Sequence, residues 1–259
     1  MRQWRLIAEQ RQSCRWNMAV DEALLRCFRP AADRPILRIY RWKPALSFGR
    51  AGPVRNVVDM HSVEERHLAF VRRMTGGGVL VHGDDLSYAM ILPDSFAKTM
   101  GVKQSYRHLC SFLIKCYETL GLHAGFAAQQ QIAAQSSAVC LAGTEAYDIM
   151  IGGAKIGGNA QRYGGGSVLQ HGSVPLRIDR AFFEPFFLQD SGLEATATLQ
   201  NLGITLTWTE LEERLIESFS KTFEATLRHD TLREDEYALA RRLYEEKYTK
   251  EAWNLDGTL

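Results

Sequence analysis

The sequence has no long hydrophobic run. Its first 16 residues, MRQWRLIAEQRQSCRW, carry arginines but no apolar stretch of the length that a signal peptide needs. No later segment approaches the roughly 20 consecutive apolar residues that cross a bilayer as a helix. We therefore expect a cytoplasmic protein that does not insert into a membrane.

Cysteine is scarce and irregularly spaced. The five cysteines stand at positions 14, 27, 110, 116 and 140, without a CxxC pair or a His/Cys cluster at ligand spacing. This pattern argues against a disulfide framework and against a zinc site, so no metal site is expected. Cys110 and Cys116 fall in a helical pattern, where packing is their expected role.

Net charge is also small, because 31 Lys and Arg offset 30 Asp and Glu. The charge is uneven, however: residues 1–50 hold eleven basic side chains and four acidic ones. Two interpretations stay open, a solvated basic face or a patch for a phosphate-bearing or acidic partner. Nucleic acid is not the expected partner, since no basic and aromatic recognition motif accompanies the arginines.

The apolar patterning predicts an α+β fold with a mixed, largely antiparallel β-sheet core flanked by helices. With 259 residues and 46% hydrophobic side chains, the chain can bury a large core, and we expect a single catalytic domain over 1–259 with a short helical tail at about 231–259. Asn17 is the expected N-cap of the first helix and Gly121 ends the second. Helices are predicted at 16–28, 106–122 and 209–227, and strands at 35–42, 68–73, 79–93 (two strands around Gly83), 147–161 (a hairpin turning at Gly152 and Gly153) and 167–176.

One cysteine stands apart from the others. Cys140 follows a polar segment, AAQQQIAAQSSA, and directly precedes the glycine-containing stretch LAGT. A nucleophilic thiol needs positive charge or oriented N–H groups to stabilise its thiolate, and Lys155 on the predicted hairpin is the candidate for that charge. The alternatives are a structural thiol and a solvated surface lysine.

A glycine-rich segment, Thr75 to Gly78, lies between two predicted strands. Consecutive glycines expose N–H groups that can cradle a phosphate or an oxyanion, although a plain tight turn explains them equally well. The spacing matches neither a P-loop nor a dinucleotide fingerprint. Arg72 and Arg73 precede the segment and point to opposite faces of a strand, so only one of them can face a pocket shared with the glycines.

Several long motifs resemble one enzyme superfamily. RRMTGGGVLVHGDDLSYAMI is similar to the RRxTGGxxVxH…LTYS segment of the biotin/lipoate ligase and octanoyltransferase superfamily, and GAKIGGNAQRYGGGSVLQHGSVPL to its GxKixGxAQ…LQHGSixL segment. WNMAVDEALL, YRWKPALSFGR and EKYTKEAWNL resemble further stretches of the same superfamily, in the same order. Within it, VCLAGTEAYDIMIGGAKIGGNAQ is most similar to LipM-type octanoyltransferases, whose acyl-accepting cysteine matches Cys140 and whose lysine matches Lys155.

The resemblance implies an octanoyltransferase of lipoate biosynthesis. Octanoyl would pass from octanoyl acyl carrier protein to Cys140 as a thioester, and then to the lysine of a lipoyl-domain protein such as the glycine cleavage H protein, with no cofactor. The resemblance also suggests a monomer. The motifs mark the following as substrate-binding: Arg72, Thr75, Gly76, Gly77, Gly78, His82, Gly157, Asn159, Gln161 and His171.

Two alternatives remain. The transferase branch often has arginine at the position of Gly78, whereas lipoate–protein ligases have glycine there, as this chain does. Such ligases activate free lipoate or octanoate with ATP and Mg²⁺. In such a ligase Cys140 would be incidental. The third hypothesis is a carrier-binding or regulatory protein that has lost activity on the same fold.

Overall fold

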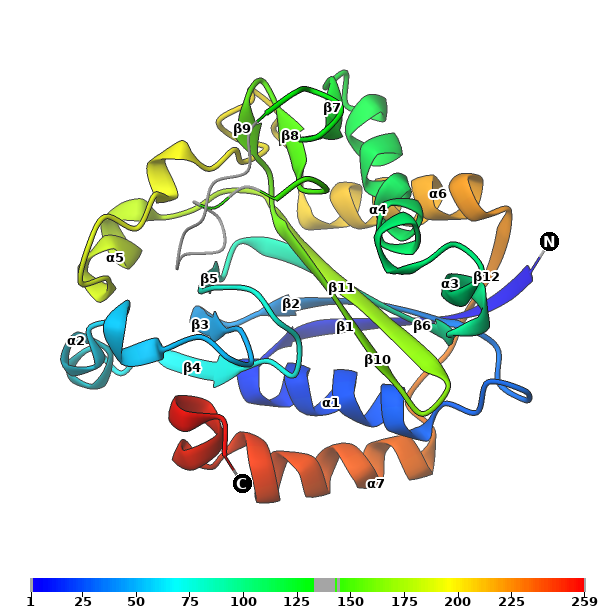
Figure 1. Ribbon diagram of the computed structural model, residues 1–259, viewed down its shortest axis with the longest axis horizontal. Coiled ribbons are helices and arrows are strands. Elements are labelled where there is room, and N and C mark those ends of the chain that lie inside the picture. Colours follow the sequence, from blue (N-terminus) through cyan, green and yellow to red (C-terminus); the bar gives the residue numbers. More distant parts are fainter. Residues whose placement is uncertain (1, 133–142, 144, 259) are drawn as a thin grey trace.

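The computed structural model describes residues 2–132, 143 and 145–258, and its centre is a six-stranded sheet (Figure 1). The strand order across this sheet is β10-β11-β6-β2-β1-β12. These strands are β1 (Arg2–Gln12), β2 (Ile36–Trp42), β6 (Asp85–Pro93), β10 (Gly158–Gly164), β11 (Ser167–Pro175) and β12 (Ala225–His229).

The sheet mixes both strand directions. β1 pairs in parallel with β2 and β12, whereas the pairs β2 with β6, β6 with β11, and β10 with β11 are antiparallel. The expected mixed, largely antiparallel sheet is therefore confirmed.

Helices cover both faces of the sheet (Figure 1). On one face α4 (Val102–Thr119) and α6 (Trp208–Phe223) pack their apolar sides over Leu37 and Ile39 of β2. On the other face α1 (Cys14–Cys27) and α7 (Glu234–Leu243) cover Ile36 and Tyr40 of the same strand. Because successive strand residues point to opposite faces, one apolar strand serves two separate cores.

Two three-stranded sheets flank the central one. The first has the order β4-β3-β5 and the second, β7-β8-β9, contains the predicted hairpin with Gly152 and Gly153 at its turn, both at positive φ. Their strands are β3 (Ala45–Phe48), β4 (Ala69–Arg72), β5 (Leu80–His82), β7 (Ala124–Phe126), β8 (Ile149–Ile151) and β9 (Ala154–Lys155). The shorter helices are η1 (Val54–Asn56), α2 (Met60–Glu65), α3 (Ser95–Lys98), α5 (Arg180–Phe183), η2 (Glu184–Phe186) and η3 (Leu193–Ala195).

Helix ends differ from the predicted ones for identifiable reasons. Ser13, not Asn17, caps α1, because Asn17 is buried one turn inside the helix and its amide oxygen accepts a hydrogen bond from Arg38 at 2.9 Å. Helix α6 begins with a capping box between Thr207 and Glu210. It ends at Phe223 rather than 227, since the next residues form β12 against β1.

The C-terminal segment is fastened to the N-terminal half. After α7 come two π-helical turns, η4 (Tyr244–Tyr248) and η5 (Ala252–Asp256). Lys247 Nζ lies 2.8 Å from a carboxylate oxygen of Glu22, to which Tyr248 also donates, and Trp253 Nε1 donates to the backbone oxygen of Arg72 at 3.0 Å. In the part of the chain that the structure describes, no helix is both long and apolar enough to span a membrane.

Candidate active site

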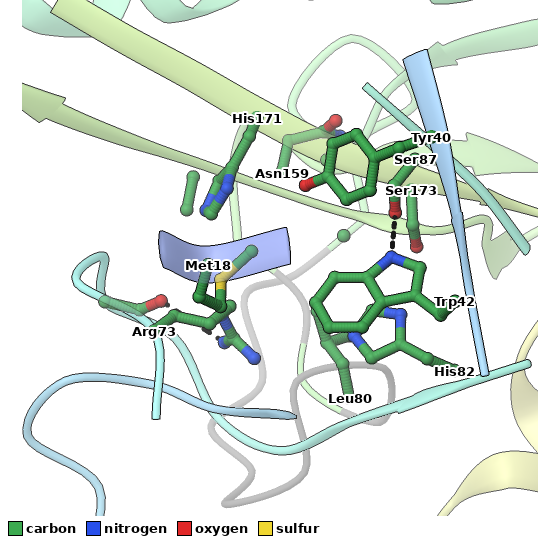
Figure 2. Close-up of a pocket in the computed structure, with 14 residues that line it drawn as sticks. Met18, Tyr40, Trp42, Arg73, Leu80, His82, Ser87, Asn159, His171 and Ser173 are labelled. Atoms are coloured by element: carbon green, nitrogen blue, oxygen red, sulfur yellow. Dashed lines mark hydrogen bonds between the residues drawn. The ribbon is translucent and has the colours of Figure 1, made fainter. Parts of the chain in front are cut away.

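A pocket of about 380 Å³ opens where α1, β2, β5, β6, β10 and β11 meet (Figure 2). Trp42 lies against the ring of His82, with centroids 3.9 Å apart, and Leu80 and Met18 add further apolar side chains to the lining. The full lining is Met18, Tyr40, Trp42, Arg73, Gly76, Leu80, His82, Ser87, Gly158, Asn159, Ala160, His171, Gly172 and Ser173.

The glycine-rich segment forms one edge of this pocket and is held against the end of β3. Gly49 N–H donates to the carbonyl of Gly78 at 3.2 Å, and Arg50 N–H donates to that of Thr75 at 2.8 Å. A Cβ on Gly49 would lie only 1.6 Å from the carbonyl oxygen of Gly77, which itself has φ +100°. The two segments can approach this closely only without side chains, and Gly76 alone of the three glycines lines the pocket.

The two consecutive arginines have separate roles. Arg73 lines the pocket, where its guanidinium donates to the backbone carbonyl of Ser47 at 2.7 Å and to that of Gly78 at 2.9 Å. Arg72, predicted to bind substrate, does not line this pocket. Its guanidinium donates instead to backbone carbonyls, including Gly49 at 2.8 Å and Trp253 at 3.1 Å. The two consecutive arginines thus point apart, with Arg73 at the pocket and Arg72 against the C-terminal turns.

His82 is fixed by a chain of polar contacts. Its Nδ1 donates to the Asp85 carboxylate at 2.8 Å, which leaves Nε2 to accept from the Ser47 hydroxyl at 2.7 Å. Ser47 Oγ in turn accepts from Arg73 at 2.6 Å. The carboxylate of Asp85 therefore holds the guanidinium that lines the pocket through His82 and Ser47, and it also accepts from the N–H of Gly83 at 3.0 Å.

His171, which also lines the pocket, is held in a similar way. Its Nδ1 donates to Asp21 at 3.1 Å and its Nε2 accepts from the Thr75 hydroxyl at 2.7 Å. Burial alone would raise the pKa of Asp21, but the charge of Arg38 and the hydrogen bond from His171 outweigh it and lower that pKa below its ordinary value. Asp21 thus stays ionised, and it orients both His171 and Tyr40, which donates to it at 2.9 Å.

The GGNAQ stretch contributes one of its predicted residues to the pocket directly. Asn159 lines it, and its amide oxygen accepts from Tyr88 at 2.8 Å. A Cβ on Gly157, at φ +69°, would lie 2.0 Å from the backbone oxygen of Ser173, so this glycine allows close strand contact and does not line the pocket. Gln161 lies outside the lining as well, and accepts from Tyr163 at 3.4 Å.

Lys155 is buried on β9. Its ammonium lies 2.6 Å from a carboxylate oxygen of Asp148 and donates to the carbonyl oxygen of Gly143 at 3.1 Å. Asp148 also accepts from the N–H of Glu145 at 2.8 Å. Cys140 lies outside the residues that the structure describes.

The four other cysteines have the properties of packing residues. Burial raises the pKa of Cys14 to about 12 and that of Cys116 to about 11, and it also raises the pKa of Cys110. The pKa of Cys27 is raised too, by partial burial and by the nearby charge of Asp235. A thiol whose pKa is raised holds little thiolate near neutral pH, so none of these four suits nucleophilic attack.

The sequence analysis did not predict most of the aromatic and apolar side chains that line the pocket. Trp42, Tyr40 and Met18 sit in patterns typical of core residues, and nothing local distinguishes a pocket wall from a core. For Arg73 a signal existed in the strand alternation, but it does not say which face carries the ligand. Among the described residues, no group of three or more His, Cys, Asp or Glu side chains is placed to hold a metal ion.

Comparison with known proteins gives consistent results. Residues 13–220 match the family described as the lipoyl protein ligase A/B catalytic domain. The chain is 31% identical to an octanoyltransferase LipM of Exiguobacterium sibiricum, over 98% of this chain and 99% of that protein. Among solved structures, a lipoate-protein ligase A bound with ATP superposes with a TM-score of 0.84 at 27% identity, over 98% of this chain and 99% of the other. A bipartite lipoate protein ligase of Thermoplasma acidophilum, studied with its E2 lipoyl domain, gives 0.81 at 26% identity, over 98% and 97% of the two chains.

Proposed function

The chain belongs to the lipoyl protein ligase A/B catalytic domain family and is an octanoyltransferase of lipoate biosynthesis, and we propose that it transfers octanoyl through a thioester on Cys140. The proposed donor is octanoyl acyl carrier protein. The proposed acceptor is the lysine of a lipoyl-domain protein such as the glycine cleavage H protein, and no cofactor takes part.

One observation carries the roles of Cys140 and Lys155. The buried ammonium of Lys155 donates to the carbonyl of Gly143, only three residues after the cysteine. Positive charge close to a thiol favours its thiolate, and the same charge stabilises an oxyanion that forms beside it. The unsuitable environments of the four described cysteines support the assignment further, because they leave Cys140 as the candidate nucleophile.

The reaction has two exchange steps. The Cys140 thiolate attacks the thioester carbonyl, a new C–S bond forms, and the C–S bond to the carrier breaks as the carrier thiolate leaves and takes up a proton. The neutral amine of the acceptor lysine then attacks the acyl-enzyme, loses a proton as the amide forms, and releases the Cys140 thiolate. The first step exchanges one thioester for another, so it needs no activation by ATP.

The pocket provides a place for the acyl chain. Trp42, Leu80 and Met18 present apolar surface, and each methylene buried against such surface stabilises binding by about 0.8 kcal/mol. Arg73 and Gly76 also line the pocket, and we propose that the thioester carbonyl is positioned beside them. Among the other predicted substrate-binding residues, Thr75 would shape this edge of the pocket through His171, and Gly77 and Gly78 through close backbone contacts. Gly157 would allow the close contact with Ser173, and Gln161 lies outside the lining.

The chain is further proposed to act as one catalytic domain. Its C-terminal turns are bound to α1 and β4 through the Glu22 and Arg72 contacts, and Arg72 lies directly before the arginine that lines the pocket. Arg72 is thereby reassigned from substrate binding to the support of the site.

The test is the mass of the intact protein after mixing with octanoyl acyl carrier protein in the absence of ATP. We expect a gain of one octanoyl group in the wild-type protein and in Cys27→Ala, the variant of a half-buried cysteine, and no gain in Cys140→Ala. A stable gain in Cys140→Ala would contradict the covalent role.

The ATP-dependent ligase is the second candidate, favoured by the similarity to the lipoate-protein ligase that binds ATP. In this candidate ATP and Mg²⁺ would convert free acid to an acyl-adenylate at the same pocket. Octanoylation of a lipoyl domain only when free octanoate and ATP are supplied, without an acyl-enzyme, would establish it.

A further inference from the structure

A second hollow, of about 1170 Å³, lies near the acyl pocket but does not share its lining. Four basic side chains line it: Arg26 of α1, Arg50 after β3, Arg162 of β10 and Lys247 of η4. We call these four residues the basic groove. Among the described residues that line this hollow, Glu22 is the single acidic one.

The positive charge of the basic groove is only partly neutralised. Glu22 is shared between Arg26 and Lys247, and it also accepts from Tyr248. Arg50 is exposed and lies over the ring of Trp253, 5.3 Å from its centroid, while Arg162 donates to the backbone oxygen of Met74 at 3.1 Å. One carboxylate against four cations leaves a net positive hollow, which attracts anions.

The groove and the acyl pocket are adjacent along two segments of the chain. Along β10, Ala160 lines the pocket and Arg162, two residues later and on the same face, lines the groove. Two residues of a strand span about 7 Å. Before the glycine-rich segment, Arg73 lines the pocket and Met74 lines the groove. A ligand that carries an anion in the groove can therefore have its acyl end in the pocket if a flexible chain joins the two.

We propose that the basic groove binds the phosphate of the phosphopantetheine arm of the acyl carrier protein. This inference rests on the proposed function, because it takes the carrier to be the donor. The arm has the required chemistry: a phosphate at one end, a long flexible chain, and the thioester at the other end. Arginine guanidinium groups bind phosphate through paired N–H donors, and three arginines line this groove.

The experiment measures initial rates with three donors: octanoyl acyl carrier protein, octanoyl-phosphopantetheine and octanoyl-pantetheine, which lacks the phosphate. The variant is Arg26→Gln with Arg50→Gln. The matched control is Arg241→Gln. The side chains of Arg241 and Arg26 are similarly exposed, at 60% and 53%, and each forms an ion pair with a glutamate four residues away.

For the double variant we expect KM to rise about tenfold or more for both phosphate-bearing donors, with kcat unchanged. For octanoyl-pantetheine KM should stay as in the wild type, and Arg241→Gln should match the wild type with all three donors. Circular dichroism and melting temperature of the double variant check that it is folded.

Several results would overturn the inference. An unchanged KM with octanoyl-phosphopantetheine would exclude phosphate recognition, even if KM for the carrier protein rose. A rise of KM for the lipoyl-domain acceptor alone would assign the groove to the acceptor. These outcomes differ from failure of the proposed function, in which the wild-type protein itself would form no acyl-enzyme from any donor.

Discussion

The close contact between Gly49 and the glycine-rich segment allows a sharp test of the site. A Cβ at Gly49 would lie 1.6 Å from the carbonyl oxygen of Gly77, whereas ordinary contacts of a Cβ begin near 3.4 Å. In Gly49→Ala the two must separate by about 1.8 Å, the difference between these distances. One atom is the added Cβ and the other is a backbone oxygen, so no side-chain rotation can relieve the clash.

The displacement would act directly on the pocket, because Gly76 of this segment lines it and Arg73, which also lines it, donates to the carbonyl of Gly78. Overpacking of this kind costs about 1–3 kcal/mol of stability. Misplacement of a positioning group by about 1 Å can lower activity about 100-fold. We therefore expect Gly49→Ala to remain folded with reduced stability, and to lose about 100-fold in kcat/KM for octanoyl transfer.

The control for this variant is Gly52→Ala. A Cβ on Gly52 would meet the same Gly77 oxygen at 4.0 Å, which is an ordinary contact, and Gly52 is not among the glycines at positive φ. Urea unfolding and steady-state transfer rates should leave Gly52→Ala near the wild type. Full activity of Gly49→Ala would refute the view that the close backbone contact positions the pocket edge.

Three further variants test other parts of the site. Lys155→Ala should form the acyl-enzyme at least 100-fold more slowly, measured by rapid-quench mass analysis; a wild-type rate would remove the lysine from the mechanism. Asp21→Asn removes a negative charge that pairs with the buried guanidinium of Arg38. It should lower the free energy of unfolding, measured by urea denaturation, by about 3 kcal/mol. Because the pKa of Asp21 is lowered on folding, its contribution is present above about pH 4 and lost as pH falls further, so the variant should also lose part of the acid dependence of stability. Trp253→Ala should raise the susceptibility of the C-terminal turns to proteolysis, and unchanged digestion would show that the Arg72 contacts suffice alone.

The sequence predicted those elements whose signals are local. The hairpin at Gly152 and Gly153 has a turn signal between two apolar runs, and the strand 35–42 and the helix 16–28 have clear periodicity, so each appears close to its predicted place. β1 was missed because Arg2–Gln12 intersperses charged and polar residues with apolar ones and contains no turn signal. Its stability comes from parallel pairing with β2 and β12, which are distant in sequence.

The error at the end of α6 has the same origin. Residues 225–227, ATL, continue the apolar pattern of the helix, but in the fold they pair with β1, and Glu224 adopts a left-handed conformation at φ +47° to make the change of direction. Likewise, strand alternation indicated that Arg72 and Arg73 separate, but the choice between them depended on where the C-terminal turns pack. Long-range contacts of this kind leave no local pattern in the sequence.

Fold similarity alone does not separate a transferase from a ligase in this family. The two solved structures compared above are lipoate-protein ligases, one of them bound with ATP, whereas the relative from Exiguobacterium sibiricum is an octanoyltransferase. The chemical difference lies in the donor. A thioester already carries an activated acyl group, and a free acid must be activated by ATP before an amine can attack it.

This difference gives a prediction about metal and nucleotide. Because both proposed exchange steps start from thioesters, we expect the rate of octanoyl transfer from the carrier protein to a lipoyl domain to be unchanged by excess EDTA and by apyrase. The same treatments should abolish any octanoylation that starts from free octanoate, since acyl-adenylate formation consumes ATP and uses Mg²⁺. Loss of carrier-dependent transfer in EDTA would mean that a divalent ion takes part in the exchange itself, and the positive charge assigned to Lys155 would then be insufficient for it.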